Sequence, residues 1–555
     1  MMPEADHLII APILIPFLAG ALMLLYDERR RQMKLTVSIV AAALMLLAGI
    51  ELLRRANGAG FAGGSDVGYY LLGDWAVPWG IVLVLDRLSA LMVVLTGLLA
   101  LPVLIYASAG WHRQGQHFLS LMMFLFMGLN GAFLTGDLFS LFVFFEVLLT
   151  ASYGLLLHGG GQFRVRAGLH YVAINLAGSV LFLIGVALIY GATGTLSMAH
   201  LSELMITLDG SRRPLVHAGG AVIALAFLVK AGIWPLSFWL PSAYMAAPAP
   251  VAAMFAILTK VGIYILMRLS FLIFGPTAGE SYGFGAWVLM AGGMATMVYG
   301  MLGILGSQAL GRMAAHVVLL SSGTLLAVTG IALLQGDGAA MISGALYYLV
   351  SSTLGAGMLF LLFEPMSRDE GGIAAMLALT ADAYGLDPAD TEEDADPAPG
   401  QWLQIPGLMT ALAVAYSAAV LVLAGLPPLS GFIGKFMMLA GGIGEGGVAT
   451  TAVWVFAALL LTAGFATLIG LMRIGIQTFW ANDGDAPPIR MLEAAPVIAL
   501  TAKLVLITVR AEDVLRYTNA TARALEAPTL YVDGVFAAPR VADAEENGAA
   551  GEDAP

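Results

Sequence analysis

The chain has 555 residues, of which 59% are hydrophobic and only 11% are charged, and its mean hydropathy is +0.88. Soluble globular domains carry about 25% charged residues, so this composition excludes a soluble globular enzyme. It also excludes disorder over most of the chain, because disordered segments are poor in aliphatic residues. The composition therefore predicts a polytopic membrane protein.

The net charge of −12 is concentrated in two short segments. Nine acidic residues lie between positions 365 and 400 and five between 540 and 555, whereas the rest of the chain has equal numbers of acidic and basic residues. We expect a solvated cytoplasmic loop at 365–400 and a solvated tail after residue 540. No basic surface indicates nucleic-acid binding.

Cysteine is absent, which excludes disulfides, thiol catalysis and cysteine-ligated clusters. The eight histidines show no spacing typical of metal ligands. We therefore expect neither a redox cofactor nor a resident metal ion.

Fourteen apolar segments follow one another along the chain, and we expect an all-α fold with about fourteen transmembrane helices. About 20 residues are needed for one crossing. The eighth and twelfth segments are too long for one straight crossing and contain prolines, so we expect them to be broken or strongly tilted. The segments lie near Leu8–Tyr26, Leu35–Leu53, Asp86–Ser108, His117–Thr135, Asp137–His158, Leu169–Tyr190, Gly219–Trp239, Met245–Phe274, Phe284–Gly306, Ala309–Leu334, Met341–Phe363, Leu403–Leu439, Thr450–Arg473 and Met491–Val509.

The first connection is rich in basic residues: Arg29, Arg30, Arg31 and Lys34. Short connections of this kind lie in the cytoplasm, which predicts an external N-terminus. With fourteen crossings, the C-terminus is expected outside as well.

Four ionisable residues interrupt the apolar segments: Glu146, Lys230, Lys260 and Lys435. Each such group costs about 2.5–3.5 kcal/mol at the bilayer centre, so it must be paired, hydrated or neutralised. Such groups are what a proton path through a low-dielectric region requires. A structural tie between Glu146 and Lys230 is the alternative interpretation.

Two further titratable residues lie in apolar segments. His316 is one turn from Arg312, and it could carry a proton near neutral pH or simply pack in the core. Lys503 could face a partner subunit or lie near the lipid headgroups.

A short sequence echo links two proline-containing breaks. Pro235-Leu236-Ser237 recurs as Pro428-Leu429-Ser430, in the seventh and twelfth segments, and a lysine lies near each break. These two segments cross in opposite directions, as inverted repeats around a midplane ion path would.

The four charges lie on separate helices, so a proton path would run sideways from helix to helix. A cation that approaches Glu146 would weaken its hold on Lys230 and push the lysine's proton onward. Glu146 itself could bind either a proton or a transient cation.

Several motifs resemble a known family of membrane subunits. WLPSAY, APVAA and TKVGIY within Phe227–Leu269 are similar to the antiporter-like subunits of respiratory complex I, group 4 membrane hydrogenases and Mrp antiporters. The resemblance is greatest to the D-type subunit of the Mrp system, which is also called Pha or Mnh. Three further stretches agree with this: Leu423–Phe436, Gly470–Trp480 and Val514–Tyr531.

The resemblance implies that Glu146, Lys230, Lys260 and Lys435 form a hydrated polar axis along the membrane midplane. It also implies two inverted five-helix repeats, of helices four to eight and nine to thirteen, with helices seven and twelve broken. The implied domains are 1–116 (three helices), 117–274 (first repeat), 284–474 (second repeat, with the acidic loop) and 475–555 (the last helix and an external acidic tail).

This chain departs from the family pattern at four positions. Many relatives carry histidine where this chain has Ser237 and Tyr244, and Mrp-type relatives often have histidine at the position of Ser351. At a fourth position, relatives usually carry a lysine beside the arginine of the tenth helix, whereas here Gly311 precedes Arg312. The proton link in the second repeat could therefore be weakened, or rerouted through His316.

The implied function is ion translocation in a hetero-oligomeric antiporter of the bacterial cell membrane, which exchanges cytoplasmic Na⁺ or K⁺ for external H⁺. Such a chain is a transporter subunit and not an enzyme. The alternatives are a proton-pumping subunit of an NADH:quinone oxidoreductase or a membrane hydrogenase, and a proton-coupled subunit for inorganic-carbon uptake. An inert scaffold is disfavoured, because apolar residues would serve it better than mid-membrane charges.

Overall fold

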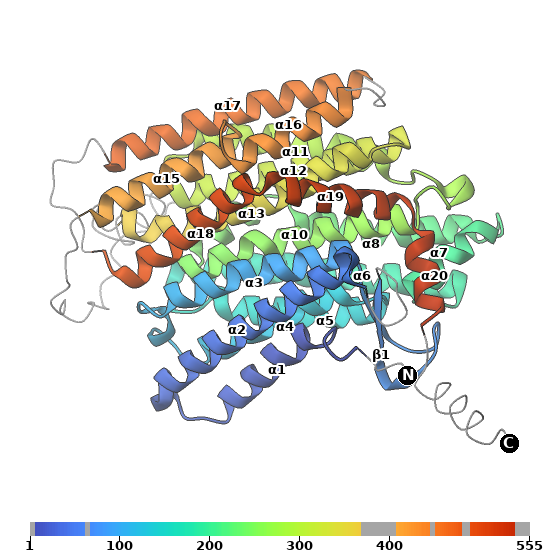
Figure 1. Cartoon of the computed structure of the whole chain (residues 1–555), viewed down its shortest axis with the longest axis horizontal. Helices are drawn as coiled ribbons and strands as arrows, with labels where there is room; N and C mark the ends of the chain where they lie inside the picture. The colour runs from blue at the N-terminus through green and yellow to red at the C-terminus, as the bar shows by residue number, and fades with distance from the viewer. Residues whose placement is uncertain (1–5, 61–66, 368–406, 444–449, 480–488, 539–555) are drawn as a thin grey trace.

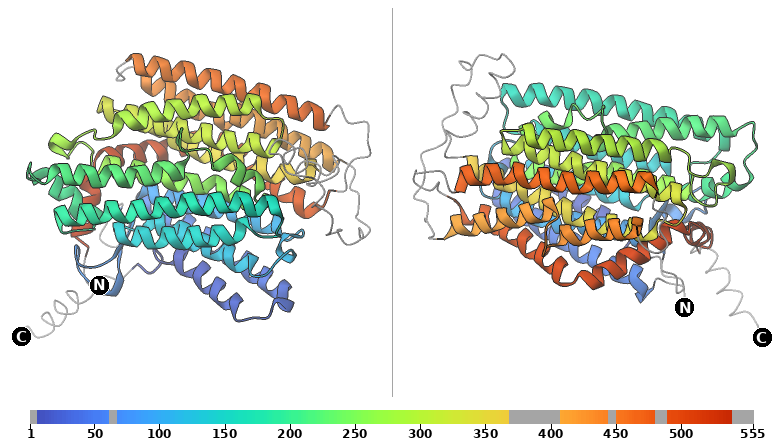
Figure 2. Two further views of the ribbon diagram at one scale, coloured as in Figure 1. Left: turned by 180° about the vertical axis from the view of Figure 1, so that it is seen from behind. Right: turned by 90° about the horizontal axis from the view of Figure 1, so that it is seen from above.

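The computed structural model of the chain describes residues 6–60, 67–367, 407–443, 450–479 and 489–538. In these ranges the protein is a bundle of long helices that run roughly side by side, with α1 and α17 at opposite edges (Figures 1 and 2). A two-stranded antiparallel hairpin, β1 (Gly68–Leu71) and β2 (Val82–Leu85), lies at one end of the bundle (Figure 1).

Eleven helices of the described ranges are long and apolar enough to cross a membrane. They are α2 (Arg31–Arg54), α3 (Arg87–Ala107), α5 (Leu138–Leu156), α6 (Gln162–Thr193), α8 (Arg213–Ala231), α10 (Ala249–Leu272), α11 (Ala286–Gly306), α12 (Leu310–Gln335), α13 (Ala339–Ser367), α17 (Thr451–Phe479) and α18 (Met491–Val509).

Four shorter apolar helices complete the set: α1 (Ala11–Leu24), α4 (Phe118–Leu134), α15 (Leu408–Ala424) and α16 (Ser430–Ile443). Taking α15 and α16 as the two halves of one segment, the helices match the fourteen predicted apolar segments in order. The prediction of a polytopic all-α membrane protein is confirmed.

Helix α10 lies inside the bundle, and every one of its residues is buried. It packs against α3, α8, α12 and α13. Peripheral helices instead expose large apolar side chains, such as Leu47 on α2, Leu169 on α6 and Phe465 on α17. Because lipid tails are apolar, this surface suits a bilayer, and the charged residues of α10 have only protein around them.

The seventh predicted segment is interrupted after α8. Gly232 ends α8 with a positive φ of 76°, and the Ile233 amide donates to the Leu228 carbonyl at 3.0 Å. The short helix α9 (Leu240–Ala246) follows, just beyond the predicted end of the segment at Trp239. A glycine in the left-handed conformation is the usual end of a helix, and proline commonly follows it, as Pro235 does here.

The twelfth predicted segment is also interrupted at a glycine in the left-handed conformation. Gly425 ends α15 with φ of 77°, and the Leu426 amide donates to the Leu421 carbonyl at 2.9 Å. The echo between the two breaks therefore extends to Ala-Gly before the Pro-Leu-Ser tripeptide, in 231–237 and in 424–430. The prediction that the twelfth segment is broken is confirmed.

The eighth segment differs from its prediction. The segment was expected to be broken or strongly tilted, and it is interrupted only near its start. Met245 and Ala246 belong to α9, whereas helix α10 is continuous from Ala249 to Leu272. Pro248 is the N-cap residue and Pro250 lies in the first turn, where a missing backbone N–H leaves no helical hydrogen bond unmade. The chain is interrupted before α10, at Ala247 and Pro248, and again further upstream between α8 and α9.

Three α-helices and the β-hairpin were not predicted. Helix α7 (Met198–Thr207) precedes α8, whereas α19 (Ala511–Glu526) and α20 (Thr529–Phe536) follow α18 and pack on the bundle. Residues 511–536 are therefore folded helices and not part of a tail. The acidic residues of the predicted loop and those after residue 540 lie outside the described residues.

The break at Gly425 gives a test of this architecture. A Cβ added there would clash with Cδ of Lys435, and alanine in the left-handed conformation costs about 1–2 kcal/mol. We expect Gly425→Ala to lower the unfolding midpoint in detergent. Gly407→Ala is the matched control, because Gly407 has φ of 88° but open space around it. Equal losses in the two variants would contradict the tight packing of Lys435 against this break.

Candidate functional site

Lys230 lies at the last turn of α8, buried between α5 and α6. Its Nζ is 3.3 Å from the Ser179 hydroxyl and 3.7 Å from the centroid of the Phe145 ring. No carboxylate of the described residues lies within ion-pair distance. Glu146, the next residue on α5, is half-buried, and its Oε1 has no hydrogen-bond partner in the described chain. The direct tie between Glu146 and Lys230 is therefore not formed.

Lys260 lies on α10 and is 1% exposed. Its Nζ donates to the Ser321 hydroxyl on α12 at 2.9 Å, and the Ser322 hydroxyl is 3.5 Å away. The Ser321 hydroxyl is in turn 2.8 Å from the Ser352 hydroxyl on α13. Hydroxyl groups, which can both donate and accept, thus lead from Lys260 towards the second half of the chain.

Lys435 lies on α16, just beyond the second break. Its Nζ donates to the carbonyls of Leu423 and Ala424 at 3.2 and 2.8 Å. These carbonyls are free because α15 ends there, and the negative end of a helix dipole favours a cation. The Tyr348 ring lies 5.9 Å from Nζ, and Tyr348 is one turn from Ser352 on α13. Side chains of α12 and α13 therefore lie between Lys260 on α10 and Lys435 on α16.

His316 points to a different part of the bundle. Its Nδ1 is 2.9 Å from the Arg312 carbonyl, its ring lies 5.7 Å from the Tyr299 ring on α11, and it packs against Gly303. The structure shows no contact between His316 and the described lysines of the candidate site. Lys503 on α18 is also apart, since it donates to the Leu98 carbonyl of α3 at 2.6 Å.

Buried hydroxyls without partners accompany the two breaks. Ser237 and Ser430 occupy the same position in the two breaks, both are fully buried, and neither Oγ has a hydrogen-bond partner in the described chain. The hydroxyl of Tyr153, two turns beyond Glu146 on α5, is also buried without a hydrogen-bond partner in the described chain. Buried polar groups are almost always satisfied, so these are places for bound water.

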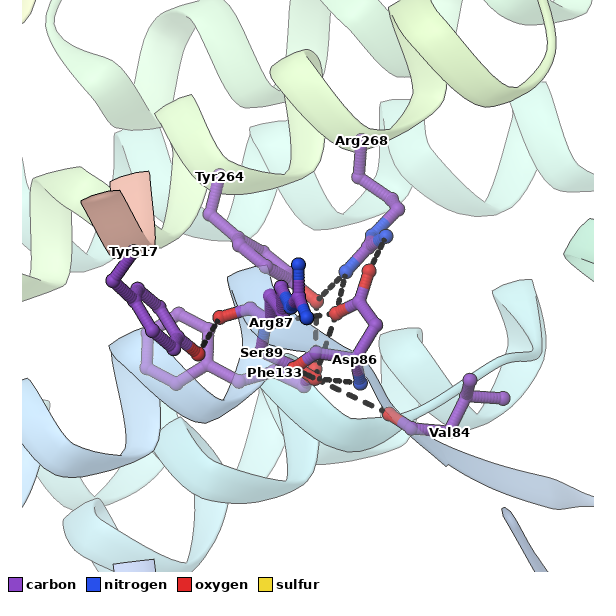
Figure 3. Close-up of polar contacts among 8 residues, drawn as sticks. All are labelled: Val84, Asp86, Arg87, Ser89, Phe133, Tyr264, Arg268 and Tyr517. Carbon is purple, nitrogen blue, oxygen red and sulfur yellow. Dashed lines mark hydrogen bonds and ion pairs between the residues drawn. The ribbon is translucent and has the colours of Figure 1, made fainter. Parts of the chain in front are cut away.

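A separate ion pair ties α3 to α10. Asp86 caps α3 and accepts from Arg268 at 2.5 and 2.7 Å and from the Ser89 amide at 2.9 Å (Figure 3). Tyr264 accepts from Arg268 at 3.3 Å and donates to the Phe133 carbonyl at 2.6 Å. This pair was not predicted, although Arg268 is a charge inside an apolar segment and that signal could have found it.

The groups that contact each buried cation decide whether the cation can exchange its proton. Lys260 and Arg268 lie eight residues apart on one face of α10, but only Arg268 is neutralised by a carboxylate. An amine held by hydroxyls and carbonyls can release its proton without leaving an unpaired carboxylate behind. Lys230, Lys260 and Lys435 are thus suited to exchange protons, and their roles and those of Glu146 and His316 stay predictions.

Comparison with known proteins identifies the class. Residues 135–384 match the family model of the NADH:quinone oxidoreductase/Mrp antiporter transmembrane region. The chain is 50% identical over 543 residues to the D component of a probable K⁺/H⁺ antiporter of Rhizobium meliloti, covering 96% of this chain and 98% of that protein. It is 32% identical to the D component of the Na⁺/H⁺ antiporter of Alkalihalophilus pseudofirmus, with 96% and 99% covered.

A solved structure agrees with these relatives. A chain of the Mrp complex from Dietzia sp. superposes with a TM-score of 0.77 at 26% identity, covering 96% of this chain and 100% of that chain. The protein is therefore a multi-pass membrane transporter subunit of the antiporter-like class. Within that class, it belongs to the family of D-type subunits of Mrp antiporters.

The ion pair between Asp86 and Arg268 gives a second prediction. Their side chains are 13% and 8% exposed, and removing one partner of a buried pair costs about 3–5 kcal/mol. We expect Arg268→Gln and Asp86→Asn each to lower the unfolding midpoint strongly. The double variant should recover part of the loss, because it leaves no unpaired charge. A double variant that loses the full sum of the single losses would contradict the coupling.

Proposed function

We propose that this chain translocates protons in a multi-subunit cation/proton antiporter, through Glu146, Lys230, Lys260 and Lys435 in that order. The observation that carries the proposal is the burial of three lysines that make no ion pair within the described residues and contact hydroxyls, carbonyls and aromatic rings instead. A purely structural lysine at such depth would be expected to have a carboxylate partner.

The electrostatic coupling proceeds from the first repeat to the second. A cation or proton that arrives at Glu146 reduces the negative potential at Lys230, so that the Lys230 proton moves towards Lys260. From Lys260 the path uses Ser321 and Ser352 and reaches Lys435 beside Tyr348. Water at Ser237, Ser430 and Tyr153 would bridge the gaps in which no direct hydrogen bond is present.

The first cation to test is K⁺. The relative named for K⁺/H⁺ exchange is 50% identical to this chain, against 32% for the relative named for Na⁺/H⁺ exchange. We further propose that the chain works with other membrane subunits, since the superposed chain belongs to an Mrp complex. The proposed orientation puts the β-hairpin outside and the basic α1–α2 connection, at the opposite end of the bundle, in the cytoplasm (Figure 1).

A redox-linked proton pump is the second candidate, because the matched family model includes NADH:quinone oxidoreductase. Purification of the native assembly separates the two functions. Small hydrophobic partner subunits support the antiporter, whereas flavin or iron–sulfur subunits support the redox pump.

Replacement of Glu146 tests the proposed function. Glu146→Gln keeps the shape of the side chain but removes the charge that couples to Lys230, so we expect cation/proton exchange in everted vesicles to fall to background. Glu203→Gln, which changes an exposed acid of α7, is the matched control and should retain exchange. Normal exchange in the Glu146→Gln protein, at normal membrane abundance, would refute the path.

Replacement of Ser321 tests the link between the two repeats. A hydrogen bond to a charged group contributes about 1.5–3 kcal/mol, so Ser321→Ala should slow exchange by about tenfold or more. Ser343→Ala is the control, because this buried serine of α13 bonds Thr518 at 2.9 Å, away from the lysines. If both variants transport equally well, Ser321 has no part in the path.

A further inference from the structure

A pocket opens at the end of the bundle that carries the β-hairpin. Its volume is about 840 Å³, and it is enclosed by α19 and α20 on one side and by Val67 and the start of α3 on the other. None of the four residues of the proposed proton path lines it. The pocket therefore belongs to a different site.

The polar wall of the pocket is cationic. Arg516, Asn519 and Arg523 all line it, and their spacing of three and four residues puts them on one face of α19. Arg87, at the start of α3, is a third guanidinium in the lining. The opposite face of α19 is buried against the bundle through Tyr517, Thr518, Thr521, Ala522 and Leu525, so the helix cannot turn its arginines away.

Donors on this wall are available. Arg516 makes one exposed ion pair, with Glu512 at 2.9 Å. The side chains of Arg523 and Asn519 make no hydrogen bond or ion pair within the described residues. Guanidinium groups bind phosphate with two parallel hydrogen bonds, and an amide adds a further donor.

The single acidic residue of the lining does not oppose an anion. Asp86 is bound by Arg268 at 2.5 and 2.7 Å, as Figure 3 shows. Arg268 is itself held between the rings of Tyr264 and Tyr531, at 5.4 and 5.3 Å from their centroids. The Asp86 charge is thus neutralised inside the protein. Arg516 shares its charge with the exposed Glu512, and Arg87 and Arg523 leave the pocket net positive.

The remaining lining is small and apolar. It consists of Val67, Ala520, Ala524, Ala527 and Leu530, together with Tyr531 and Gly534. Helix α19 begins directly after the membrane helix α18, with only Arg510 between them, so the pocket lies close to one surface of the bilayer. Cationic donors beside an apolar surface at this depth match a molecule with an anionic head and an apolar stem.

We propose that this pocket binds the headgroup of an anionic phospholipid, with the phosphate at Arg516, Asn519 and Arg523 and the glycerol and first acyl carbons along the alanines of α19. An acidic segment of a partner protein could bind the same donors, but its charged side chains would not match the apolar residues of the lining. Inorganic phosphate shares the head chemistry and is separated from lipid by experiment.

The test is a lipid titration of the purified complex in detergent, read as the unfolding midpoint of this subunit. Phosphatidylglycerol should raise the midpoint, whereas phosphatidylcholine and inorganic phosphate should have little effect. Arg516→Gln with Arg523→Gln should demand about tenfold or more phosphatidylglycerol for the same shift, because both charged donors to the phosphate are lost. Arg510→Gln, which changes an exposed arginine of the same region outside the pocket, is the control.

Three results would overturn the proposal. The first is an unchanged phosphatidylglycerol response in the double variant. The second is an equal effect of inorganic phosphate, which would indicate a simple anion site. The third is loss of a partner subunit from the double variant without any lipid effect, which would indicate an acidic protein segment. If the double variant is poorly folded, Arg523→Gln alone gives the same comparison, because Arg523 has no ion pair within the described residues to lose.

Discussion

The burial of lysine ammonium groups without carboxylate partners is the constraint on which the rest of the structure depends. Lys230, Lys260 and Lys435 are 4%, 1% and 7% exposed, and each would cost about 2.5–3.5 kcal/mol if left bare at the bilayer centre. The fold offsets this cost with neutral groups. It uses serine hydroxyls at Lys230 and Lys260, the face of the Phe145 ring at Lys230, and the free carbonyls of a broken helix at Lys435. The second break is therefore part of how the Lys435 charge is held.

Helix α10 carries two buried cations of different kinds: Arg268, which has a carboxylate partner, and Lys260, which makes no ion pair within the described residues. Arg268 has a bidentate carboxylate partner and stacks between two tyrosines, so it is fixed in its charged form. Lys260, two turns away, has hydroxyl partners that serve either protonation state. The first arrangement ties helices together, and the second permits proton exchange. The complete burial of α10 keeps both away from lipid.

The sequence predicted the class, the number of apolar segments and the charges inside them, because hydropathy and misplaced charge are local signals. The position of the interruption in the eighth segment was not predicted, because a proline in the first turn and a proline in a helix interior look alike in composition. Nothing in the sequence indicated that Phe145 and Ser179 surround Lys230, or that Ser321 and Ser352 link α12 to α13, since such contacts depend on how helices face one another. Helix α19 was overlooked because its buried residues include Thr518 and Thr521, so the stretch does not stand out as an apolar segment.

The most direct measurement is a structure of the assembled complex at a resolution that shows ordered water. The account predicts water at Ser237, Ser430 and the hydroxyl of Tyr153, in a continuous chain that joins Glu146 to Lys230 and continues past Lys260 to Lys435. Dry, closed surroundings at these groups, or a carboxylate of another subunit bonded to each lysine, would contradict a lateral proton path through this chain.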